Sequence, residues 1–350
     1  MSSGSGAPPG RSAASGINLH THLEGSVRPE TAADLAASQG VPTPPGGWEA
    51  GLRMAAPGSL TDFLAHVALV YPLMGTPDAM RRVVHEAVVD AAADGILFLE
   101  LRFGPATHAR PGFGLDQVVA AACEGAASGV AATGTPAGIV VCALRHHDDS
   151  TNEEVARAAA GLAGRGVVGF DVAGDEALFP DLQRLRTPFA IAAAAGLGLT
   201  AHAAEAGPAA SVRSAVEVLG VRRIGHGSRA AEDPELLAWA ADQGVCFEVC
   251  PTSNVFTGAA SSYAAHPMRA FGAAGCDVVV GDDDPVTIGR RLGGEFAAIE
   301  SQVGIEPGAI RRIHATSVAR AFCEPSTRRQ IAEGAAHLTG GEAPTESART

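Results

Sequence analysis

The chain has 350 residues, of which 46% are hydrophobic and 18% are charged, so it can bury one large core. Its formal net charge of −13 at pH 7 argues against a nucleic-acid partner, because phosphate binding needs clustered basic side chains, but it leaves small neutral ligands open. The sequence contains no lysine, which excludes Schiff-base chemistry, a pyridoxal phosphate anchor, a P-loop lysine and a metal pair bridged by a carboxylated lysine.

The two ends of the sequence differ from its middle in composition. Residues 1–15 are rich in Ser, Gly, Pro and Ala, lack the apolar stretch of a secretory signal peptide, and are predicted to be disordered. Residues 336–350 are predicted to form a disordered C-terminal tail. No run of about 18 apolar residues occurs, so no membrane span is expected. The six cysteines form no CxxC pair, which predicts free thiols and a cytoplasmic protein.

Eight short apolar runs, typical of β-strands, recur along the chain and are separated by Ala-rich stretches. The runs cover residues 16–22, 96–103, 138–144, 167–172, 197–203, 223–227, 245–251 and 277–281. Helices are predicted between them, and the clearest amphipathic ones cover residues 81–93, 115–127 and 211–219.

Apolar strands that alternate with helices predict a parallel sheet covered on both faces. Eight such units favour the α/β class and a closed (β/α)8 barrel of the TIM type, with residues 16–335 as a single domain. A doubly wound open sheet is the alternative fold, although no GxGxxG follows the first strand. Residues 40–80 are an insertion after the first strand, helical from about Leu60, and we expect this insertion to cover the barrel as a lid.

Polar clusters follow four of the predicted strands at their C-terminal ends, where catalytic groups collect in a barrel. The clusters are His20-Thr21-His22, His202-Ala203-Ala204-Glu205, Gly225-His226-Gly227 and Asp282-Asp283-Asp284-Pro285. Imidazoles two residues apart on a strand point to the same side and suit a zinc-type ion. Adjacent buried carboxylates repel one another unless a cation is near. Each cluster alone also fits an ordinary strand end or open loop, but together they predict one metal-centred site.

With these clusters, the sequence resembles the adenosine deaminase family of metal-dependent hydrolases over residues 16–320. The resemblance is carried by His20-Thr21-His22-Leu23-Glu24-Gly25-Ser26, Glu100-Leu101-Arg102-Phe103, Asp171-Val172-Ala173-Gly174-Asp175-Glu176, His202-Ala203-Ala204-Glu205, Gly225-His226-Gly227, Cys250-Pro251-Thr252-Ser253-Asn254 and Asp283-Asp284-Pro285. It implies a cytoplasmic hydrolase of purine metabolism that converts adenosine or deoxyadenosine to inosine or deoxyinosine and releases ammonia.

The resemblance implies one Zn²⁺ ion per chain, with a coordination position left for water. Its ligands would be His20, His22, His202 and Asp283. His226 would orient or deprotonate the water, and Glu205 would protonate the purine ring nitrogen N1.

The same resemblance implies the contacts to the nucleoside. Asp284 would bind N7, and the backbone N–H of Gly174 would meet N3. Glu24 would contact the 5′-hydroxyl of the sugar. The apolar lid helix over the site would contribute Leu60, Phe63 and Leu64.

Three residues depart from the family pattern, and we expect all three to touch the pocket wall. Ala204 replaces a common glycine, Asp282 replaces a small Thr or Ser, and Val67 replaces an aromatic of the lid. They leave the substrate open among adenosine, free adenine and a modified 6-aminopurine nucleoside of a specialised pathway. Two functions of other kinds stay open as well: a one-metal hydrolase of a cyclic amide or ester, and a catalytically dead nucleoside-binding relative. The oligomeric state stays open.

Overall fold

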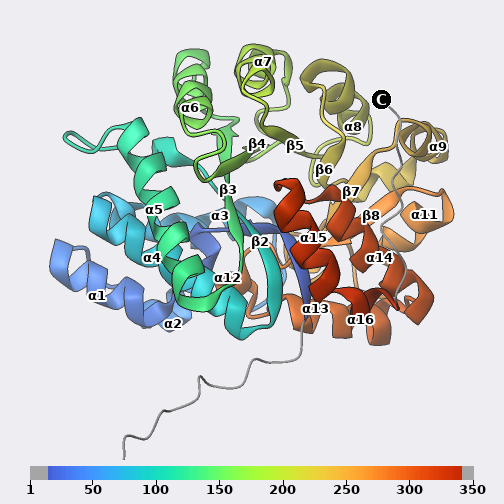
Figure 1. The fold of residues 1–350 in the computed structure, drawn as a ribbon, viewed down its shortest axis with the longest axis horizontal. Helices are drawn as coiled ribbons and strands as arrows, with labels where there is room; N and C mark the ends of the chain where they lie inside the picture. Colours follow the sequence, from blue (N-terminus) through green and yellow to red (C-terminus); the bar gives the residue numbers. More distant parts are fainter. Residues whose placement is uncertain (1–14, 341–350) are drawn as a thin grey trace, which may run out of the picture.

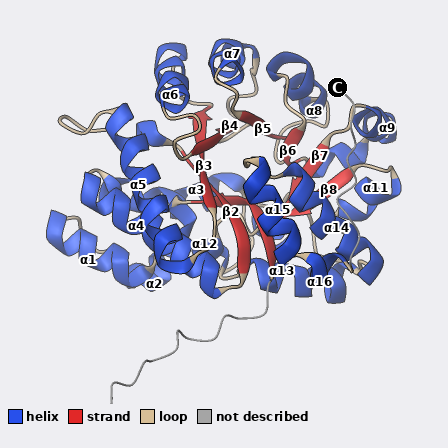
Figure 2. Cartoon of the chain, in the orientation of Figure 1, coloured by secondary structure: helices blue, strands red, loops and turns tan. Residues whose placement is uncertain are grey.

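Eight parallel strands form a ring at the centre of the molecule, and helices surround the ring (Figures 1 and 2). The structure is a computed structural model that describes residues 15–340. The strands follow one another around the ring in chain order. They are β1 (Gly16–His22), β2 (Ile96–Phe103), β3 (Ala137–Leu144), β4 (Val167–Ala173), β5 (Gly198–Ala203), β6 (Arg223–His226), β7 (Cys246–Val249) and β8 (Asp277–Val280). This arrangement confirms the predicted (β/α)8 barrel.

The ring closes where its first strand meets the segment after its last strand. The backbone N–H of His22 donates to the carbonyl of Asp283 (2.6 Å), and the N–H of Asp283 donates to the carbonyl of His20 (2.9 Å). Three of the four residues predicted to bind metal, His20, His22 and Asp283, therefore lie on the closing seam of the barrel, and the fourth, His202, lies on β5.

Helices occupy the outside of the ring, and none in residues 15–340 is both long and apolar enough to cross a membrane. Where the sequence predicts a helix at 81–93, the helix begins earlier, because Thr76 caps it and Pro77 suits its first position. The helices are α1 (Pro29–Gln39), α2 (Gly47–Leu52), α3 (Leu60–Val67), α4 (Pro77–Ala93), α5 (Leu115–Thr133), α6 (Asp149–Gly161), α7 (Arg186–Ala194), α8 (Ser211–Ser214), α9 (Pro234–Asp242), α10 (Pro251–Phe256), α11 (Met268–Ala273), α12 (Pro285–Ile288), α13 (Leu292–Ala298), α14 (Pro307–Arg320), α15 (Pro325–Gly334) and α16 (Ala336–Thr339).

Residues 40–80, the predicted insertion after β1, contain α2, α3 and the start of α4. A capping box between Ser59 and Asp62 starts α3 where the sequence predicts a helix. The helix buries Phe63 and Val67 in a small apolar cluster with Met54 and Ile288, apart from the main core. This cluster fixes α3 at the C-terminal end of the barrel, and its predicted action as a lid remains an expectation.

The predicted disordered ends lie mostly outside the described residues. Of the N-terminal segment 1–15, only Ser15 is described. Of the tail predicted at 336–350, residues 336–339 form the helix α16, and 341–350 lie outside the described range. The helical segment therefore extends farther than the sequence boundary at residue 335.

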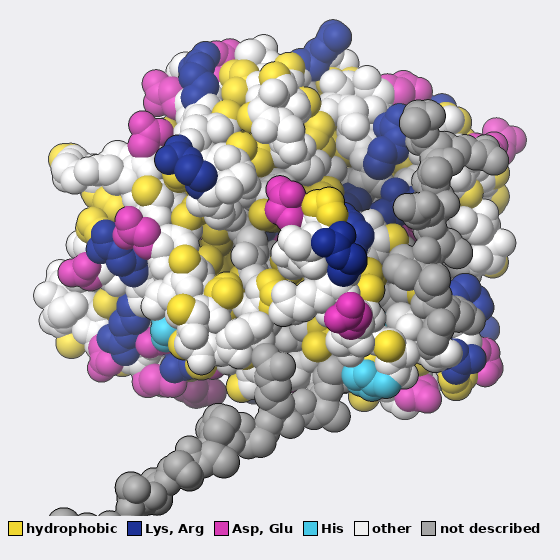
Figure 3. Space-filling model, viewed as in Figure 1, with side chains coloured by type: hydrophobic (Ala, Val, Ile, Leu, Met, Phe, Trp, Pro, Cys, Tyr) yellow, Lys and Arg dark blue, Asp and Glu magenta, His cyan; other side chains and the backbone are white. Residues whose placement is uncertain are grey.

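The surface view shows arginine and acidic side chains interspersed among neutral ones (Figure 3).

In the interior of the protein, the carboxyl group of Glu295 in α13 is fully buried. One of its oxygens accepts from the backbone N–H of Thr252 (3.1 Å), and the other has no hydrogen-bond partner. Burial raises the pKa of Glu295 to about 8.

This buried carboxyl predicts a pH-dependent stability. The folded-state pKa of Glu295 lies above its ordinary value of 4.5, so its ionisation disfavours folding increasingly as the pH rises from 4.5 to 8. We expect Glu295→Gln, whose amide oxygen still accepts from Thr252, to be more stable than the wild type by about 2–5 kcal/mol at pH 8 and by less at pH 5. Urea unfolding at both pH values measures the difference, and an identical pH dependence in the two proteins would contradict this assignment.

Candidate metal centre and substrate cavity

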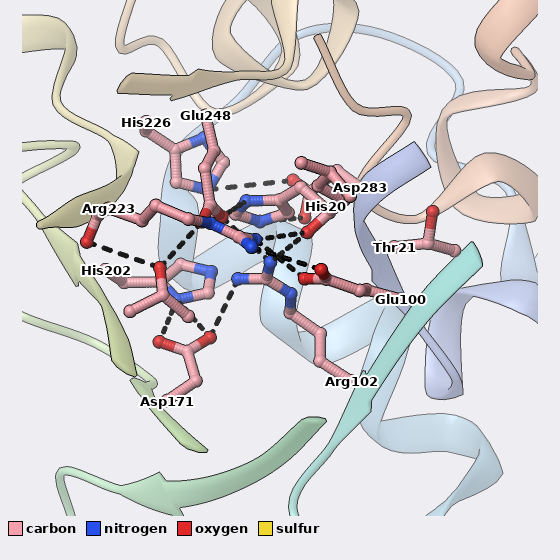
Figure 4. A network of polar contacts seen from close by, with 12 residues as sticks. His20, Thr21, Glu100, Arg102, Asp171, His202, Arg223, His226, Glu248 and Asp283 are labelled. Carbon is pink, nitrogen blue, oxygen red and sulfur yellow. Dashed lines mark hydrogen bonds and ion pairs between the residues drawn. The ribbon is translucent and has the colours of Figure 1, made fainter. Parts of the chain in front are cut away.

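Three of the predicted histidines meet at the C-terminal ends of their strands (Figure 4). The ring centroid of His20, on β1, lies 4.8 Å from the ring centroid of His202 on β5 and 4.9 Å from the ring centroid of His226 on β6. His22 joins them, with its Nε2 3.2 Å from the Nε2 of His202. The barrel thus brings together residues that lie far apart in the sequence.

The carboxylate of Asp283 completes this cluster. Its Oδ1 lies 3.4 Å from the Nε2 atoms of both His20 and His22, and its Oδ2 lies 4.0 Å from the Nε2 of His226. Two groups of residues share Asp283. Within each group, one nitrogen or oxygen atom per residue lies within 4.8 Å of the others, a spacing that one metal ion can bridge. The groups are His20, His202, His226 and Asp283, and His22, Asp283 and Asp284.

Carboxylates behind two of the histidines fix which ring nitrogen carries the proton. The Nδ1 of His20 lies 2.8 Å from an oxygen of Glu248, and the Nδ1 of His202 lies 3.0 Å from an oxygen of Asp171. Because an ionised carboxylate only accepts hydrogen bonds, each Nδ1 carries the proton. The lone pair of each ring is then on Nε2, which faces the cluster.

Two buried arginines keep these carboxylates ionised. Arg102 donates to Asp171 and to Glu248 (both 2.8 Å), and Arg223 donates to Glu248 (2.6 Å) and to Glu100 (2.7 Å). Burial alone would raise the pKa of Glu248, but Arg223 and Arg102 lower it well below its usual range. The pKa of Asp171 is lowered in the same way, by His202 and Arg102 against burial.

These buried charged residues form an ionic layer that is not predicted from the sequence: Glu100, Arg102, Asp171, Arg223 and Glu248. Arg102 is predicted only as part of a motif, and no role is predicted for Glu248 or Arg223. The available signal was the presence of charged residues within otherwise apolar strands, since such residues are almost never fully buried without a partner.

The clustered atoms fit a divalent cation. The Nε2 of His20 is buried and has no hydrogen-bond partner. The Nε2 atoms of His22 and His202 face each other at 3.2 Å, and the latter carries a lone pair. Imidazole nitrogens beside one carboxylate are the donors that zinc-type ions prefer. A bound cation would satisfy these lone pairs and offset the charge of Asp283.

Glu205 lies beside the cluster at the end of β5. One of its oxygens accepts from the hydroxyl of Thr257 (3.0 Å), and the other lies 3.6 Å from the Nε2 of His226. Burial, followed by the negative charges of Asp283 and Glu176, raises the pKa of Glu205 well above its usual value. The side chain is therefore suited to hold a proton at neutral pH and to donate it.

The turn that carries Glu205 is built around Glu176. Oxygens of Glu176 accept from the backbone N–H groups of Ala204 (3.0 Å), Ala206 (2.6 Å) and Gly207 (2.7 Å). A Cβ atom at Gly207 would lie 2.8 Å from an oxygen of Glu176, so the turn requires glycine there. Glu176 is predicted only as part of the motif Asp171-Val172-Ala173-Gly174-Asp175-Glu176, with no role of its own.

Left-handed backbone also marks this site. Among residues 15–340, the non-glycine residues with positive φ are Ala204, His226 and Asp283, at 56°, 60° and 56°. This conformation costs an L-residue about 1–2 kcal/mol. All three lie at or just after strand ends, where strained backbone commonly positions functional groups.

A cavity of about 270 Å³ opens in front of the cluster. Every predicted substrate-contact residue lines it, together with all predicted metal ligands except His20. The predicted residues on its wall are His22, Glu24, Leu60, Phe63, Leu64, Gly174, His202, Glu205, His226, Asp283 and Asp284. Tyr71, His146 and Phe179 also line it and were not predicted, because they lie outside the polar clusters.

Two acidic residues of the wall have different hydrogen-bonding states. Glu24 accepts from the ring of His108 (3.0 Å) and from the backbone N–H of Gly104 (3.2 Å). Asp284 is buried, and its Oδ1 has no hydrogen-bond partner. Burial, and then Asp283, raise the pKa of Asp284 well above its usual value. A Cβ atom at Gly25 would lie 1.9 Å from this oxygen, so only glycine fits there.

The expectation that all three departures touch the pocket wall is wrong for two of them. Val67 lines the cavity, whereas Ala204 packs in the main hydrophobic core. Asp282 points away from the cavity and accepts from Asn18 (2.7 Å) and Thr21 (2.5 Å), and burial raises its pKa to about 6. Asn18 and Thr21 of β1 hold the carboxylate of Asp282, and the apolar core surrounds Ala204, so neither side chain reaches the cavity wall.

The chain is similar to known deaminases over the whole barrel. A family model described as adenosine deaminase matches residues 16–337. An adenosine deaminase of Enterococcus faecalis is 31% identical over 318 residues, covering 90% of this chain and 94% of that protein. An aminodeoxyfutalosine deaminase of Acidothermus cellulolyticus is 33% identical over 330 residues, covering 92% of this chain and 91% of that protein. The solved structure of an adenine deaminase from Arthrobacter aurescens superposes with a TM-score of 0.83 at 25% identity, covering 94% of this chain and 100% of that chain.

The carboxylate behind His20 provides a test of the metal centre. Glu248→Gln removes the charge that holds the Nδ1 proton of His20 and that Arg102 binds. With Zn²⁺ as the probe ion, we expect the affinity of the histidine–aspartate cluster to fall about 10–100-fold, a common result when the hydrogen-bond partner of a metal-binding histidine is removed. Competition with a chelator of known affinity measures this change.

Asp282→Asn is the matched control for this experiment. It makes the same change from carboxylate to amide next to Asp283, but its side chain faces Asn18 and Thr21. We expect its zinc affinity to equal that of the wild type. Equal zinc affinity in Glu248→Gln as well would contradict the role assigned to Glu248.

Proposed function

Since the chain belongs to the adenosine deaminase family and is a hydrolase that acts on C–N bonds, we propose that it deaminates adenosine or deoxyadenosine. The products are inosine or deoxyinosine and ammonia. The observation that carries this proposal is the placement of Glu205, a buried acid, beside the histidine–aspartate cluster on the wall of one cavity.

We assign one Zn²⁺ ion per chain to this cluster. The ligands in this proposal are His20, His22, His202 and Asp283. Support comes from the Nδ1 protons of His20 and His202, which leave their Nε2 lone pairs facing Asp283. When bound, the ion supplies a Lewis acid that lowers the pKa of water towards neutrality.

In this proposal the protein's own acid activates the purine. Glu205 donates its proton to ring nitrogen N1, which makes C6 electrophilic. Its oxygen bound to Thr257 is held as an acceptor, so the proton lies on the oxygen that faces His226 and the cavity. The oxygen of water then bonds to C6, and one proton of that water passes to the exocyclic amine. The C6–N bond breaks with loss of NH3, and the proton left on the C6 oxygen returns to Glu205 as the C6=O group forms.

Three polar groups and three apolar side chains hold the nucleoside in this proposal. Asp284, kept protonated by burial, donates to the acceptor N7. The backbone N–H of Gly174 binds N3, and Glu24 binds the 5′-hydroxyl. Leu60, Phe63 and Leu64 cover the apolar faces of the ligand, and α3 acts as the lid.

A second candidate substrate is aminodeoxyfutalosine. The relative from Acidothermus cellulolyticus that bears this name is 33% identical to the chain over almost its whole length. Free adenine is a third candidate, because the solved adenine deaminase shares the fold. The distinguishing measurement is the relative kcat/KM for each compound.

We also propose the cytoplasm as the place of action. All six cysteines are free, and five of them are buried. Free thiols in this number suit a reducing compartment.

Turnover of purified, zinc-loaded protein tests the proposed reaction directly. Adenosine, deoxyadenosine, adenine and aminodeoxyfutalosine are supplied in parallel, and ammonia release is measured together with the loss of adenine absorbance. We expect the highest kcat/KM for adenosine or deoxyadenosine. No ammonia from either nucleoside would overturn this substrate assignment, even if another compound reacts.

Two variants separate acid chemistry from metal binding. Glu205→Gln removes the transferable proton and is expected to lower kcat about 10²–10⁴-fold while zinc content stays at one ion per chain. His20→Ala removes a proposed ligand and is expected to lower both zinc content and activity. Loss of zinc from Glu205→Gln, measured by elemental analysis, would contradict this division of roles.

A further inference from the structure

A line of buried polar groups lies behind His226. The side-chain nitrogen of Asn254, in α10, lies 2.9 Å from the Nδ1 of His226. The side-chain oxygen of Asn254 lies 3.0 Å from the Nε2 of His266. The Nδ1 of His266 lies 3.2 Å from the backbone nitrogen of Met268, at the start of α11. His226, Asn254 and His266 are each 3% exposed or less.

The backbone end of this line determines the direction of every hydrogen bond in it. The N–H of Met268 can only donate, so the Nδ1 of His266 accepts and its Nε2 carries the proton. That proton is donated to the oxygen of Asn254, whose nitrogen must then donate to the Nδ1 of His226. The remaining nitrogen of His226, Nε2, therefore carries the proton of the neutral ring.

A reversed Asn254 side chain is incompatible with this arrangement. Its amide nitrogen would point at the Nε2 of His266, which would have to accept. The proton of His266 would then move to Nδ1 and meet the N–H of Met268, so two donors would face each other. Burial lowers the pKa of His266 to about 4, so a doubly protonated ring does not arise at neutral pH.

We infer that the hydrogen bonds from Met268 through His266 and Asn254 hold His226 as the Nε2–H tautomer, so that His226 donates a hydrogen bond to the attacking water. In this tautomer the Nδ1 lone pair is occupied by Asn254, and Nε2 has no lone pair to offer. His226 therefore neither binds the metal nor takes the proton of the water. The inference rests on the proposed function for the identity of that water.

The hydrogen-bond partners behind His20 and His202 differ from the partner behind His226, and this difference supports separate roles for the rings. Carboxylates stand behind these two rings and place their protons on Nδ1, which leaves Nε2 free to bind a cation. An amide donor stands behind His226 and has the opposite effect. The Nε2 of His226 still faces the reacting region, 3.6 Å from Glu205 and 4.0 Å from Asp283. Asn254 and His266 are thus positioning residues for His226.

The tautomers can be read without any substrate. Two-bond ¹⁵N–¹H correlation spectra of ¹⁵N-labelled, zinc-loaded protein distinguish protonated from unprotonated imidazole nitrogens, and His226→Gln identifies the signals of residue 226. We expect Nε2–H for His226 and Nδ1–H for both His20 and His202. A spectrum with Nδ1–H for His226 overturns the inference, even if adenosine is deaminated normally. Lack of adenosine turnover together with Nε2–H would instead contradict the proposed function alone.

The hydrogen bonds from Met268 through His266 and Asn254 to His226 are called the His266 relay here. Asn254→Asp tests this relay because it replaces the donor that faces His226 with an acceptor. A carboxylate only accepts, so the proton of His226 should move to Nδ1, and we expect kcat to fall about 10–100-fold at unchanged zinc content. His266→Leu, which removes the donor to Asn254, should also lower kcat. His266→Gln restores an N–H donor and should recover most of the loss. An unchanged tautomer and kcat in Asn254→Asp would overturn the inference, and the wild-type spectrum decides it if the variant does not fold.

Discussion

Asp171 and Glu248 lie fully buried beneath the histidine cluster and stay ionised because Arg102 binds both of them. Burial of one unpaired charge costs several kcal/mol, so removal of Arg102 would leave Asp171 without an arginine partner and Glu248 with Arg223 alone. The carboxylates in turn fix the protons of His20 and His202. The geometry of the metal centre therefore depends on an ionic layer that touches neither cation nor substrate.

The same barrel end combines strain with close packing. The positive φ angles of Ala204, His226 and Asp283 turn the chain sharply where the strands stop. A Cβ atom at Gly281 would lie 2.6 Å from the carbonyl oxygen of His20, so the chain between β8 and Asp283 must pass directly over β1. The free-energy cost of this strained backbone is offset by the burial of apolar side chains in the main core.

Much of this architecture could be predicted from the sequence, because apolar runs and polar strand ends are local patterns. The eight strands lie within two residues of their predicted bounds, and the polar clusters converge as expected. The pairings of the ionic layer could not be predicted, because the closed barrel brings together residues that are far apart in the sequence: Glu248 is 228 residues from His20. The His266 relay could not be predicted because it depends on how α10 and the segment before α11 pack behind His226. Asp282 shows the same limit, because its sequence position next to Asp283 and Asp284 does not show that Asn18 and Thr21 hold it away from the cavity that the other two line.

The closing seam of the barrel has a consequence for biosynthesis. His20 and His22 leave the ribosome early, but Asp283, which bonds to both of their backbones, is among the last barrel residues to be translated. A nascent chain therefore has no complete cation site until the ring is almost finished. In the proposed zinc-bound form, an ion captured at that moment would tie the first strand to the last and would favour the closed ring over partly assembled forms.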